Sequence, residues 1–394
     1  MKKYYLISGV IFLLLTLISA CQPAEIVPTQ VCTNPTGNYE SHPKALELQQ
    51  VIDKYAQQGL PGISLLIRDG NGEWAGASGL ADIEQNINMQ PCHVSKIASV
   101  TKLFVGVLVM QLVDEGVLNL DDPISTWMPE KSIAKIENAD KATLRQLLNH
   151  TSGIYDIITD NTFYLNVLNS PGRFWKSDEL LKYAEGKPAN FEPGADVKYS
   201  NTNLLLAAMI IEEATGKSHA QMIRDRIIDP LGMDNTYYHW HDKLPNFVAQ
   251  GYYDLYNNGT ISNLSNYNTG SGNGYGGIYS TVYDMQIFIE ALLREKNLLS
   301  PAALEEMLKI TSENVERNIA FGVAIRKDFL DRSAQEYGLG HRGRDLAYSA
   351  DLYYFPNQDI TMSYLVNYGT DGKSGLQEVF FNFRDELVGI LMRE

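Results

Sequence analysis

The chain has 394 residues, 44% hydrophobic and 20% charged, a composition that excludes a disordered, collagen-like or coiled-coil protein. Acidic residues outnumber basic ones by 47 to 32, giving a net charge of −15. This argues against a nucleic-acid partner, because phosphate backbones bind clustered lysine and arginine. Three cysteines are too few for a disulfide scaffold.

The N-terminus has the pattern of an export signal. Lys2 and Lys3 precede an apolar run that ends in LISAC at positions 17–21, and a basic stretch before a short apolar core is typical of signal peptides. The ending resembles a bacterial lipobox, which implies removal of residues 1–20 and lipidation of Cys21. A membrane-spanning anchor is the alternative, although the run is short for a span. We therefore expect a protein of the bacterial cell envelope, periplasmic or in the outer membrane, attached only through its lipid.

The next stretch, residues 21–41, holds three prolines and little hydrophobic pattern. We interpret it as a tether between the lipid and the folded body. Cys32 lies in this tether, and Cys92 lies seven residues before Ser99. The two cysteines can pair in an oxidising compartment, but the sequence alone leaves both the paired and the unpaired state open because it does not give their distance.

The folded body is predicted to begin with a helix and a hairpin. Apolar residues recur on one face of residues 43–58, which predicts an amphipathic helix. The turn sequence DGNG at 69–72 joins strand-like runs at 63–68 and 73–79, as in a β-hairpin. Residues 99–115 are apolar nearly all round, which is typical of a helix buried in a core.

The middle of the chain carries more helical patterns, and its end returns to strands. Helices are expected at 142–149, 178–184, 203–214, 281–295 and 301–309. Strands are expected at 322–327, 347–355 and 360–367, before a last helix at 375–391. This order predicts an α/β (α+β) fold over residues 42–394. A sheet lobe is built from both chain ends, about 42–98 and 320–394, with a mostly helical lobe, about 99–319, inserted between them.

Residues 250–281 interleave six Tyr, six Asn and seven Gly. Glycine and asparagine permit tight turns, and tyrosine offers a flat amphipathic surface. One interpretation is a long surface loop packed by its own tyrosines. The other is a wall of a substrate cleft, because long loops are often functional.

A Ser-x-x-Lys spacing occurs three times, starting at Ser41, Ser99 and Ser132. Only Ser99 opens the most apolar helix, where unbonded N–H groups and the helix dipole stabilise a developing oxyanion. Lys102 returns to the same face one turn later, within reach of the Ser99 hydroxyl and its proton. The alternative is a capping serine and a solvated lysine.

A Tyr-x-Asn spacing also occurs three times, starting at Tyr164, Tyr199 and Tyr256. Only Tyr199 follows a rigid turn, FEPG at 191–194, and precedes a long apolar helix. The phenol is a poor base in water because its pKa is about 10. Beside Lys102 its phenolate would be favoured, which predicts a lowered pKa for Tyr199.

The third candidate segment is GHRGR at 340–344, between expected strands. A glycine on a strand lets a substrate approach the backbone closely. The N–H that follows Gly343 is a candidate second oxyanion donor.

These segments occur in a familiar order. Ser99-Val100-Thr101-Lys102, Tyr199-Ser200-Asn201 and His341-Arg342-Gly343 resemble the three motifs of the serine β-lactamase and penicillin-recognising peptidase superfamily. The branch they resemble most contains class C β-lactamases, D-alanyl-D-alanine carboxypeptidases, D-aminopeptidases and related esterases. Supporting similarities are LLNHTSG at 147–153, PLGM at 230–233 and GGIYST at 276–281. The resemblance covers about residues 43–392 and implies an antiparallel sheet flanked by helices.

The resemblance implies a role for each motif residue. Ser99 would be the acylated nucleophile, Lys102 its proton-handling partner, and Tyr199 the general base and then the acid to the leaving group. Asn201 would bind the substrate amide, and His341 would hydrogen-bond near Tyr199.

The resemblance also implies an oxyanion hole and no cofactor. The N–H groups of Ser99 and Arg344 would form the hole. His150, in a supporting motif, is interpreted as structural. We expect no metal, because His239 and His241 have no third ligand nearby.

One departure concerns the third motif. Class C β-lactamases typically carry Lys-Thr-Gly where this chain has His341-Arg342-Gly343. A histidine is mostly neutral at pH 7 and gives up a fixed cation, which favours a peptidase or esterase. One hypothesis is that Arg342 or Arg344 replaces the cation and binds a substrate carboxylate; the other is that both pair with acids such as Asp345.

The sequence therefore predicts an envelope-anchored serine hydrolase that works through a Ser99 acyl-enzyme. Its substrates would be D-amino-acid peptides, as for D-Ala-D-Ala carboxypeptidases, or small esters. The alternatives are a class C-like β-lactamase and a penicillin-binding sensor without turnover. The partners expected are a small-molecule or peptide substrate and the membrane through the lipid alone; the oligomeric state stays open.

Overall fold

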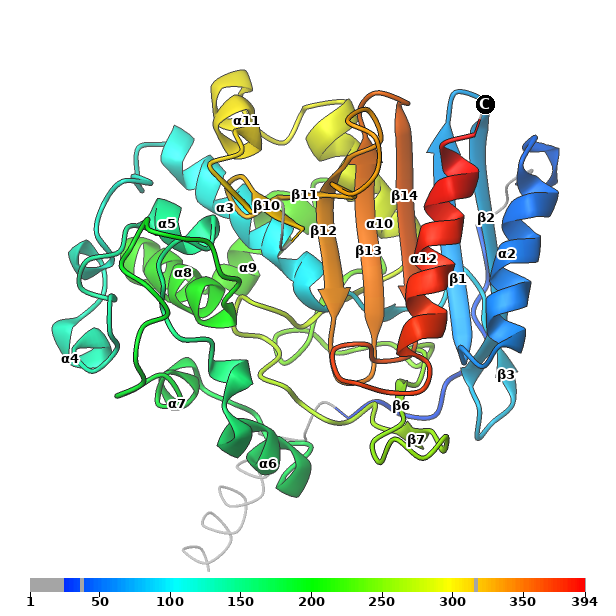
Figure 1. Cartoon of the computed structure of the whole chain (residues 1–394), viewed down its shortest axis with the longest axis horizontal. Helices are drawn as coiled ribbons and strands as arrows, with labels where there is room; N and C mark the ends of the chain where they lie inside the picture. Colours follow the sequence, from blue (N-terminus) through cyan, green and yellow to red (C-terminus); the bar gives the residue numbers. More distant parts are fainter. Residues whose placement is uncertain (1–24, 36–38, 315–317, 394) are drawn as a thin grey trace, which may run out of the picture.

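A nine-stranded antiparallel sheet runs through the computed structural model, which describes residues 25–35, 39–314 and 318–393. The predicted export signal, residues 1–20, and the lipidation site Cys21 lie outside the described residues. The strand order is β3-β2-β1-β14-β13-β12-β11-β10-β9 (Figure 1). The bounds are β1 Gly62–Asp69, β2 Gly72–Asp82, β3 Ile87–Asn88, β9 Ser312–Asn314, β10 Ile319–Phe321, β11 Arg326–Asp328, β12 Gly338–Arg344, β13 Ser349–Phe355 and β14 Ile360–Val366.

The pairing of β1 with β14 joins the two ends of the chain in one sheet. Ile63 lies opposite Val366 and Arg68 lies opposite Thr361 in an antiparallel register. The predicted fold, an antiparallel sheet flanked by helices and built from both chain ends, is confirmed.

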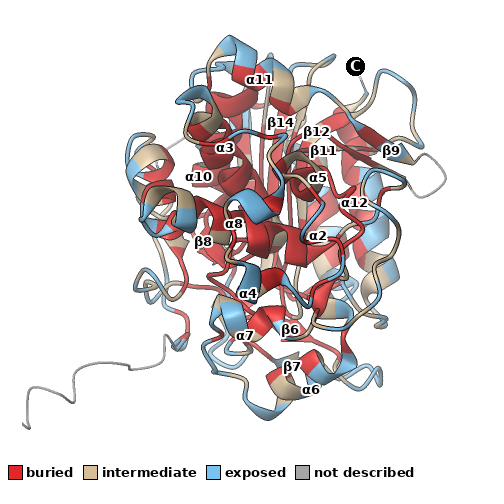
Figure 2. Cartoon of the chain, turned by 90° about the vertical axis from the view of Figure 1, so that its left-hand side faces the viewer, coloured by how far each residue is buried: buried red, intermediate tan, exposed pale blue. Residues whose placement is uncertain are grey.

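Each face of the sheet packs against its own helices, because successive side chains of a strand point to opposite faces. Ile63, Leu65 and Ile67 of β1 join a core with α2 (Ala45–Gln57) and α12 (Gln377–Leu391). Leu66 points the other way, into a second core. That core contains α3 (Thr101–Asp114), which is buried along most of its length (Figure 2), and α10 (Val282–Ile289).

The second lobe is mostly helical. Its helices are α4 Glu130–Ile133, α5 Leu144–Leu148, α6 Asn161–Asn169, α7 Ser177–Leu181, α8 Asn201–Thr215, α9 His219–Ile223 and α11 Pro301–Leu308. Shorter 3₁₀ turns are Tyr39–Ser41, Ala98–Val100, Ile124–Thr126 and Ile157–Thr159, and π-helical turns are Arg224–Ile228 and Glu290–Arg294. Two small sheets are made of β4 Ser95–Lys96, β8 Ile278–Ser280 and β5 Tyr237–Tyr238, and of β6 Tyr252–Tyr253 and β7 Ser262–Asn263. None of the helices among the described residues has the length and apolar character needed to cross a membrane.

Two expected elements differ in the structure. The helix expected from Ser99 begins at Thr101, and Ser99 itself lies in the preceding 3₁₀ turn. The strand expected at 322–327 is wrong in its bounds, because a turn separates β10 from β11. The turn packs against α11: the Val323 N–H donates to the Met307 carbonyl, and a side chain at Gly322 would clash with the same oxygen.

Residues 25–35, part of the stretch interpreted as a tether, lie against the body. The Thr29 N–H donates to Asp82 at 2.9 Å, and the Thr29 hydroxyl donates to the Val248 carbonyl at 2.6 Å. A disulfide joins Cys32 to Cys92, with Cα atoms 6.0 Å apart. Hydrogen bonds, the disulfide and the buried side chain of Ile26 hold this segment, which has little hydrophobic pattern, so composition alone did not indicate its packing.

Candidate active site

The turn that carries Ser99 has an unusual backbone. The preceding residue, Ala98, has φ = +48°, in the left-handed region that costs an alanine about 1–2 kcal/mol. The turn is held on both sides: the Ile97 N–H donates to the Ile278 carbonyl, and the Ile278 N–H donates to the Thr101 hydroxyl. Ser99 is therefore fixed where β8 meets the start of α3. Strain of this kind is typical of functional sites.

Lys102 lies below Ser99 and is buried, with 1% of its surface exposed. Its Nζ donates to Ser99 Oγ at 2.9 Å, to Asn201 Oδ1 at 2.8 Å and to the Tyr275 carbonyl at 2.6 Å. Burial lowers the pKa of Lys102 to about 7, although the carboxylate of Asp156 opposes this shift. A large neutral fraction is therefore present near pH 7, and neutral Nζ can accept the Ser99 proton.

Tyr199 adjoins both groups. Its ring centroid lies 5.1 Å from the Lys102 Nζ, and its hydroxyl hydrogen-bonds with Ser99. Burial nevertheless raises the pKa of Tyr199, and this effect outweighs the lowering by Ser99 and by the cation of Arg326. The expectation that Lys102 lowers the Tyr199 pKa is wrong, because a lysine with a pKa near 7 supplies too little fixed charge to offset burial.

His150 supports Tyr199 from behind. Their ring centroids are 4.4 Å apart, and the His150 Nδ1 accepts from the Ser200 N–H and the Asn203 amide, each at 3.2 Å. Burial lowers the pKa of His150 far below its ordinary value, so the ring is neutral. The structure thus holds His150 as a positioning residue, in keeping with its predicted structural role.

Asn201 is held by a carboxylate that sequence reasoning missed. Asp156 Oδ1 accepts from the Asn201 backbone N–H at 3.0 Å, and Oδ2 accepts from the Asn201 amide at 3.1 Å. Burial raises the pKa of Asp156 to about 6. These bonds aim the amide oxygen of Asn201 at Lys102. No spacing marks Asp156 in the sequence, since its partner lies 45 residues away.

The third motif lies on β12, and its site-facing side chains carry no charge. The His341 Nδ1 lies 2.6 Å from the Arg342 carbonyl, and burial lowers the His341 pKa far below its ordinary value. Its ring centroid is 6.2 Å from that of Tyr199. Gly343 is required for packing: a Cβ there would lie 2.1 Å from the Ile97 carbonyl oxygen, beside the Ser99 turn.

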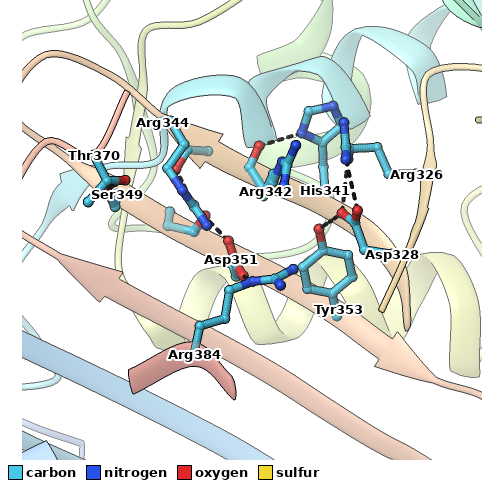
Figure 3. Close-up of polar contacts among 12 residues, drawn as sticks. Arg326, Asp328, His341, Arg342, Arg344, Ser349, Asp351, Tyr353, Thr370 and Arg384 are labelled. Atoms are coloured by element: carbon cyan, nitrogen blue, oxygen red, sulfur yellow. Dashed lines mark hydrogen bonds and ion pairs between the residues drawn. The ribbon is translucent and has the colours of Figure 1, made fainter. Parts of the chain in front are cut away.

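The Arg344 guanidinium points to the other face of the sheet (Figure 3). It pairs with Asp351 at 2.7 Å and lies over the Phe380 ring of α12. The pairing hypothesis therefore describes Arg344, but its partner is Asp351. Asp345 pairs with Lys96 instead. Successive side chains of β12 alternate between the two faces of the sheet, so His341 and Gly343 share the face toward Ser99 and Arg344 lies on the other.

A cleft opens beside Ser99. One cavity of about 200 Å³ is bordered by Ser99, Tyr199, Asn201, His341 and Arg342, among others. A smaller cavity adjoins it, bordered by Ser99, Thr269, Ser271, Tyr275 and Gly276. Residues 269–276 of the Tyr- and Gly-rich stretch thus form part of the cleft wall, as its second interpretation held. The motif residues predicted from the sequence meet at this cleft.

Comparisons with known proteins agree with this geometry. A family profile described as Beta-lactamase matches residues 48–379. A D-stereospecific amidohydrolase from Streptomyces sp. is 29% identical, with a TM-score of 0.75 over 86% of this chain and 98% of that one. A D-amino acid amidase from Ochrobactrum anthropi SV3 is 25% identical, with a TM-score of 0.76 over 87% of this chain and 97% of that one.

Curated relatives match over part of their length. The D-alanyl-D-alanine-carboxypeptidase/endopeptidase AmpH of Escherichia coli K12 is 28% identical over 249 residues, which is 62% of this chain and 61% of AmpH. Among the relatives compared, the chain spans between 37% and 64% of their length.

Proposed function

The chain belongs to the beta-lactamase family of serine hydrolases, and on this premise we propose that it hydrolyses D-amino-acid peptides, amides or small esters through a Ser99 acyl-enzyme. The observation that carries the proposal is the 2.9 Å contact between Ser99 Oγ and the buried Nζ of Lys102. The similarity to proteins named as D-amino acid amidase and D-alanyl-D-alanine-carboxypeptidase supports the substrate class.

The first half of the reaction transfers the acyl group to the enzyme. Neutral Lys102 accepts the hydroxyl proton as Ser99 Oγ attacks the substrate carbonyl. The N–H groups of Ser99 and Arg344 stabilise the oxyanion. Tyr199 stays protonated because its pKa is raised, so it donates a proton to the leaving group and regains one from Lys102.

The second half returns the enzyme to its resting state. A water attacks the acyl carbonyl, gives a proton to the Tyr199–Lys102 pair and releases the acid, and Ser99 recovers its proton. Asn201 holds the substrate amide throughout, and Asp156 keeps its side chain in place. Arg342 borders the same cavity and is the candidate group for a substrate carboxylate.

Intact mass measurement tests the acylation. The body is incubated with benzylpenicillin, beside Ser99→Ala, and turnover is followed with N-acetyl-D-Ala-D-Ala and D-alanine methyl ester. We expect a Ser99-dependent adduct and Ser99-dependent release of D-alanine. Rapid release of hydrolysed drug would favour a β-lactamase, and a stable adduct without peptide or ester turnover would favour a sensor. Turnover that survives Ser99→Ala would refute the acyl-enzyme.

We also propose that the protein is exported and anchored in the bacterial envelope by lipid on Cys21. The support is the signal-like sequence of residues 1–20. The net charge of −15 repels anionic lipid, so attachment would depend on the acyl chains. Incorporation of labelled palmitate should occur in the wild type and be lost in Cys21→Ala; equal labelling of both would refute the anchor.

A further inference from the structure

Asp371 is a carboxylate of the catalytic cleft to which the mechanism above gives no role. It borders both cavities at Ser99 and a third of about 430 Å³ that opens beside them. It is exposed to solvent and forms no ion pair among the residues that the structure describes. A charge on the cleft wall without a partner is available to a substrate.

The loop that carries Asp371 is held on both sides. The Thr370 hydroxyl lies 2.8 Å from the Ser349 hydroxyl (Figure 3). The Thr370 backbone carbonyl accepts from the Gln377 side-chain amide at 3.1 Å. Gly372 packs so closely on the Tyr253 hydroxyl that a Cβ would lie 2.3 Å from it. The carboxylate is therefore presented from a fixed backbone, as recognition requires.

The surroundings of Asp371 suit a cation. Tyr164 of α6 borders two of the same cavities, and aromatic faces attract ammonium groups. Although Asp371 is open to solvent, the surrounding cleft walls reduce its hydration, and together with the carboxylate of Asp345 they raise its pKa; a bound cation would oppose both effects. Three described cations lower the pKa of Asp371: Arg344 is committed to Asp351, Lys102 is buried under Ser99, and Arg342 borders the 200 Å³ cavity without an ion pair to Asp371.

We propose that Asp371 binds a free ammonium group of the substrate, so that the enzyme selects unblocked D-amino-acid peptides and amides over their N-acylated counterparts. This inference rests on the proposed function and specifies its substrate class. Together with Arg342, which borders the 200 Å³ cavity, it gives the cleft one site for each end of a short unblocked peptide. The protein's net charge of −15 would also attract cationic substrates.

The test compares two substrates that differ only in the amine: D-alanine p-nitroanilide and N-acetyl-D-alanine p-nitroanilide, assayed at pH 7. We expect the wild type to prefer the free amine. Asp371→Asn should lower kcat/KM for that substrate about tenfold to a hundredfold, mainly through KM, because a charge-assisted contact is lost. The acetylated substrate should change less than about twofold, and Asp371→Glu should keep most of the preference.

The control is Asp385→Asn, which removes an exposed carboxylate from α12 and should leave both substrates unchanged. An equal loss on both substrates in Asp371→Asn, or a wild type that prefers the acetylated substrate, would overturn the inference while leaving the acyl-enzyme intact. Absence of Ser99-dependent cleavage of either substrate would instead refute the proposed function, and this inference with it.

Discussion

The two faces of β12 hold opposite kinds of side chain. The face toward Ser99 presents neutral His341 and Gly343, whereas the face toward α12 presents Arg344 to a buried ion pair. Figure 3 shows Asp351 between Arg344 and Arg384, whose nitrogens lie 2.7 and 2.6 Å from its carboxylate oxygens.

One face of β12 therefore belongs to the active site, and the other face packs the sheet against α12. A positive charge beside Ser99 would depress the pKa of Tyr199, but Arg344 is committed to holding the sheet against α12. Arg326 also borders the site but is paired with Asp328, and the amine beside Ser99 is a lysine that is partly neutral near pH 7. The proposed chemistry thus depends on the buried neutral amine of Lys102, whereas the packing of the sheet against α12 depends on the buried ion pairs of Asp351.

Removal of Lys102 tests the chemical side of this comparison and should have the largest effect. Lys102→Met should lower kcat by about a thousandfold or more, because the proton acceptor for Ser99 is lost. Stability should hold or rise, since a buried amine is replaced by an apolar side chain. Steady-state kinetics and urea unfolding measure the two. Lys373→Met, at an exposed lysine beside the cleft, is the matched control.

Removal of Asp351 tests the structural side. Asp351→Asn leaves two buried guanidinium groups without their carboxylate and should lower the free energy of unfolding by about 3–5 kcal/mol. An Asp351→Asn protein that remains folded should keep a kcat near the wild-type value. Asp359→Asn removes an exposed partner of Arg294 and should cost under about 1 kcal/mol. Similar losses in the two variants would contradict the structural role of the buried network.

Gly343→Ala tests whether the site-facing side of β12 must stay bare. The added methyl would meet the Ile97 carbonyl and push on the Ser99 turn, which should cost about 1–3 kcal/mol of stability and lower kcat. Gly389→Ala, on α12, meets no neighbouring atom within 4 Å and should be neutral or stabilising by up to about 1 kcal/mol. Thermal unfolding of both variants measures the change in stability. A Gly343→Ala protein as stable as the wild type would refute the tight contact.

The sequence was most informative where chemistry follows spacing or period. The Ser99–Lys102 spacing predicted their contact, and strand alternation places His341 and Arg344 on opposite faces. Applied to the third motif, the same alternation would have removed Arg344 from the candidates for a substrate carboxylate.

The groups missed by sequence reasoning are single residues in loops. Asp156 holds Asn201, 45 residues away, and Asp371 borders a cavity lined by residues far along the chain; no period or short motif marks either of them. The lowered pKa of Lys102 and the raised pKa of Tyr199 depend on burial, which a motif does not reveal. The packing of residues 25–35 was missed for a related reason, since hydrogen bonds to distant residues, a disulfide and buried Ile26 hold a segment with little hydrophobic pattern.

The pH dependence of acylation is the finest test of the comparison. With a Lys102 pKa of about 7, the neutral fraction falls from about a half to about a tenth between pH 7 and 6, so single-turnover acylation should slow about fivefold. His150 and His341 cannot supply this limb, because burial keeps both neutral there. Asp156, whose pKa is raised to about 6, and Asp371, whose pKa is also raised, are the other candidates, and a limb that persists in both Asp156→Asn and Asp371→Asn assigns the titration to Lys102.

The titration of Lys102 also makes the stability of the folded protein depend on pH. Lysine ordinarily titrates near 10.5, so between pH 7 and 10.5 the unfolded chain holds a proton at Lys102 that the folded protein has released. Stability should therefore rise with pH in this window, by about 1 kcal/mol between pH 7 and 8. Urea unfolding of the wild type and Lys102→Met at both values isolates the term, since other groups cancel in the difference. A flat difference, joined to an acid limb well below pH 7, would mean that Lys102 stays charged, and the site-facing side of β12 would then face a fixed cation.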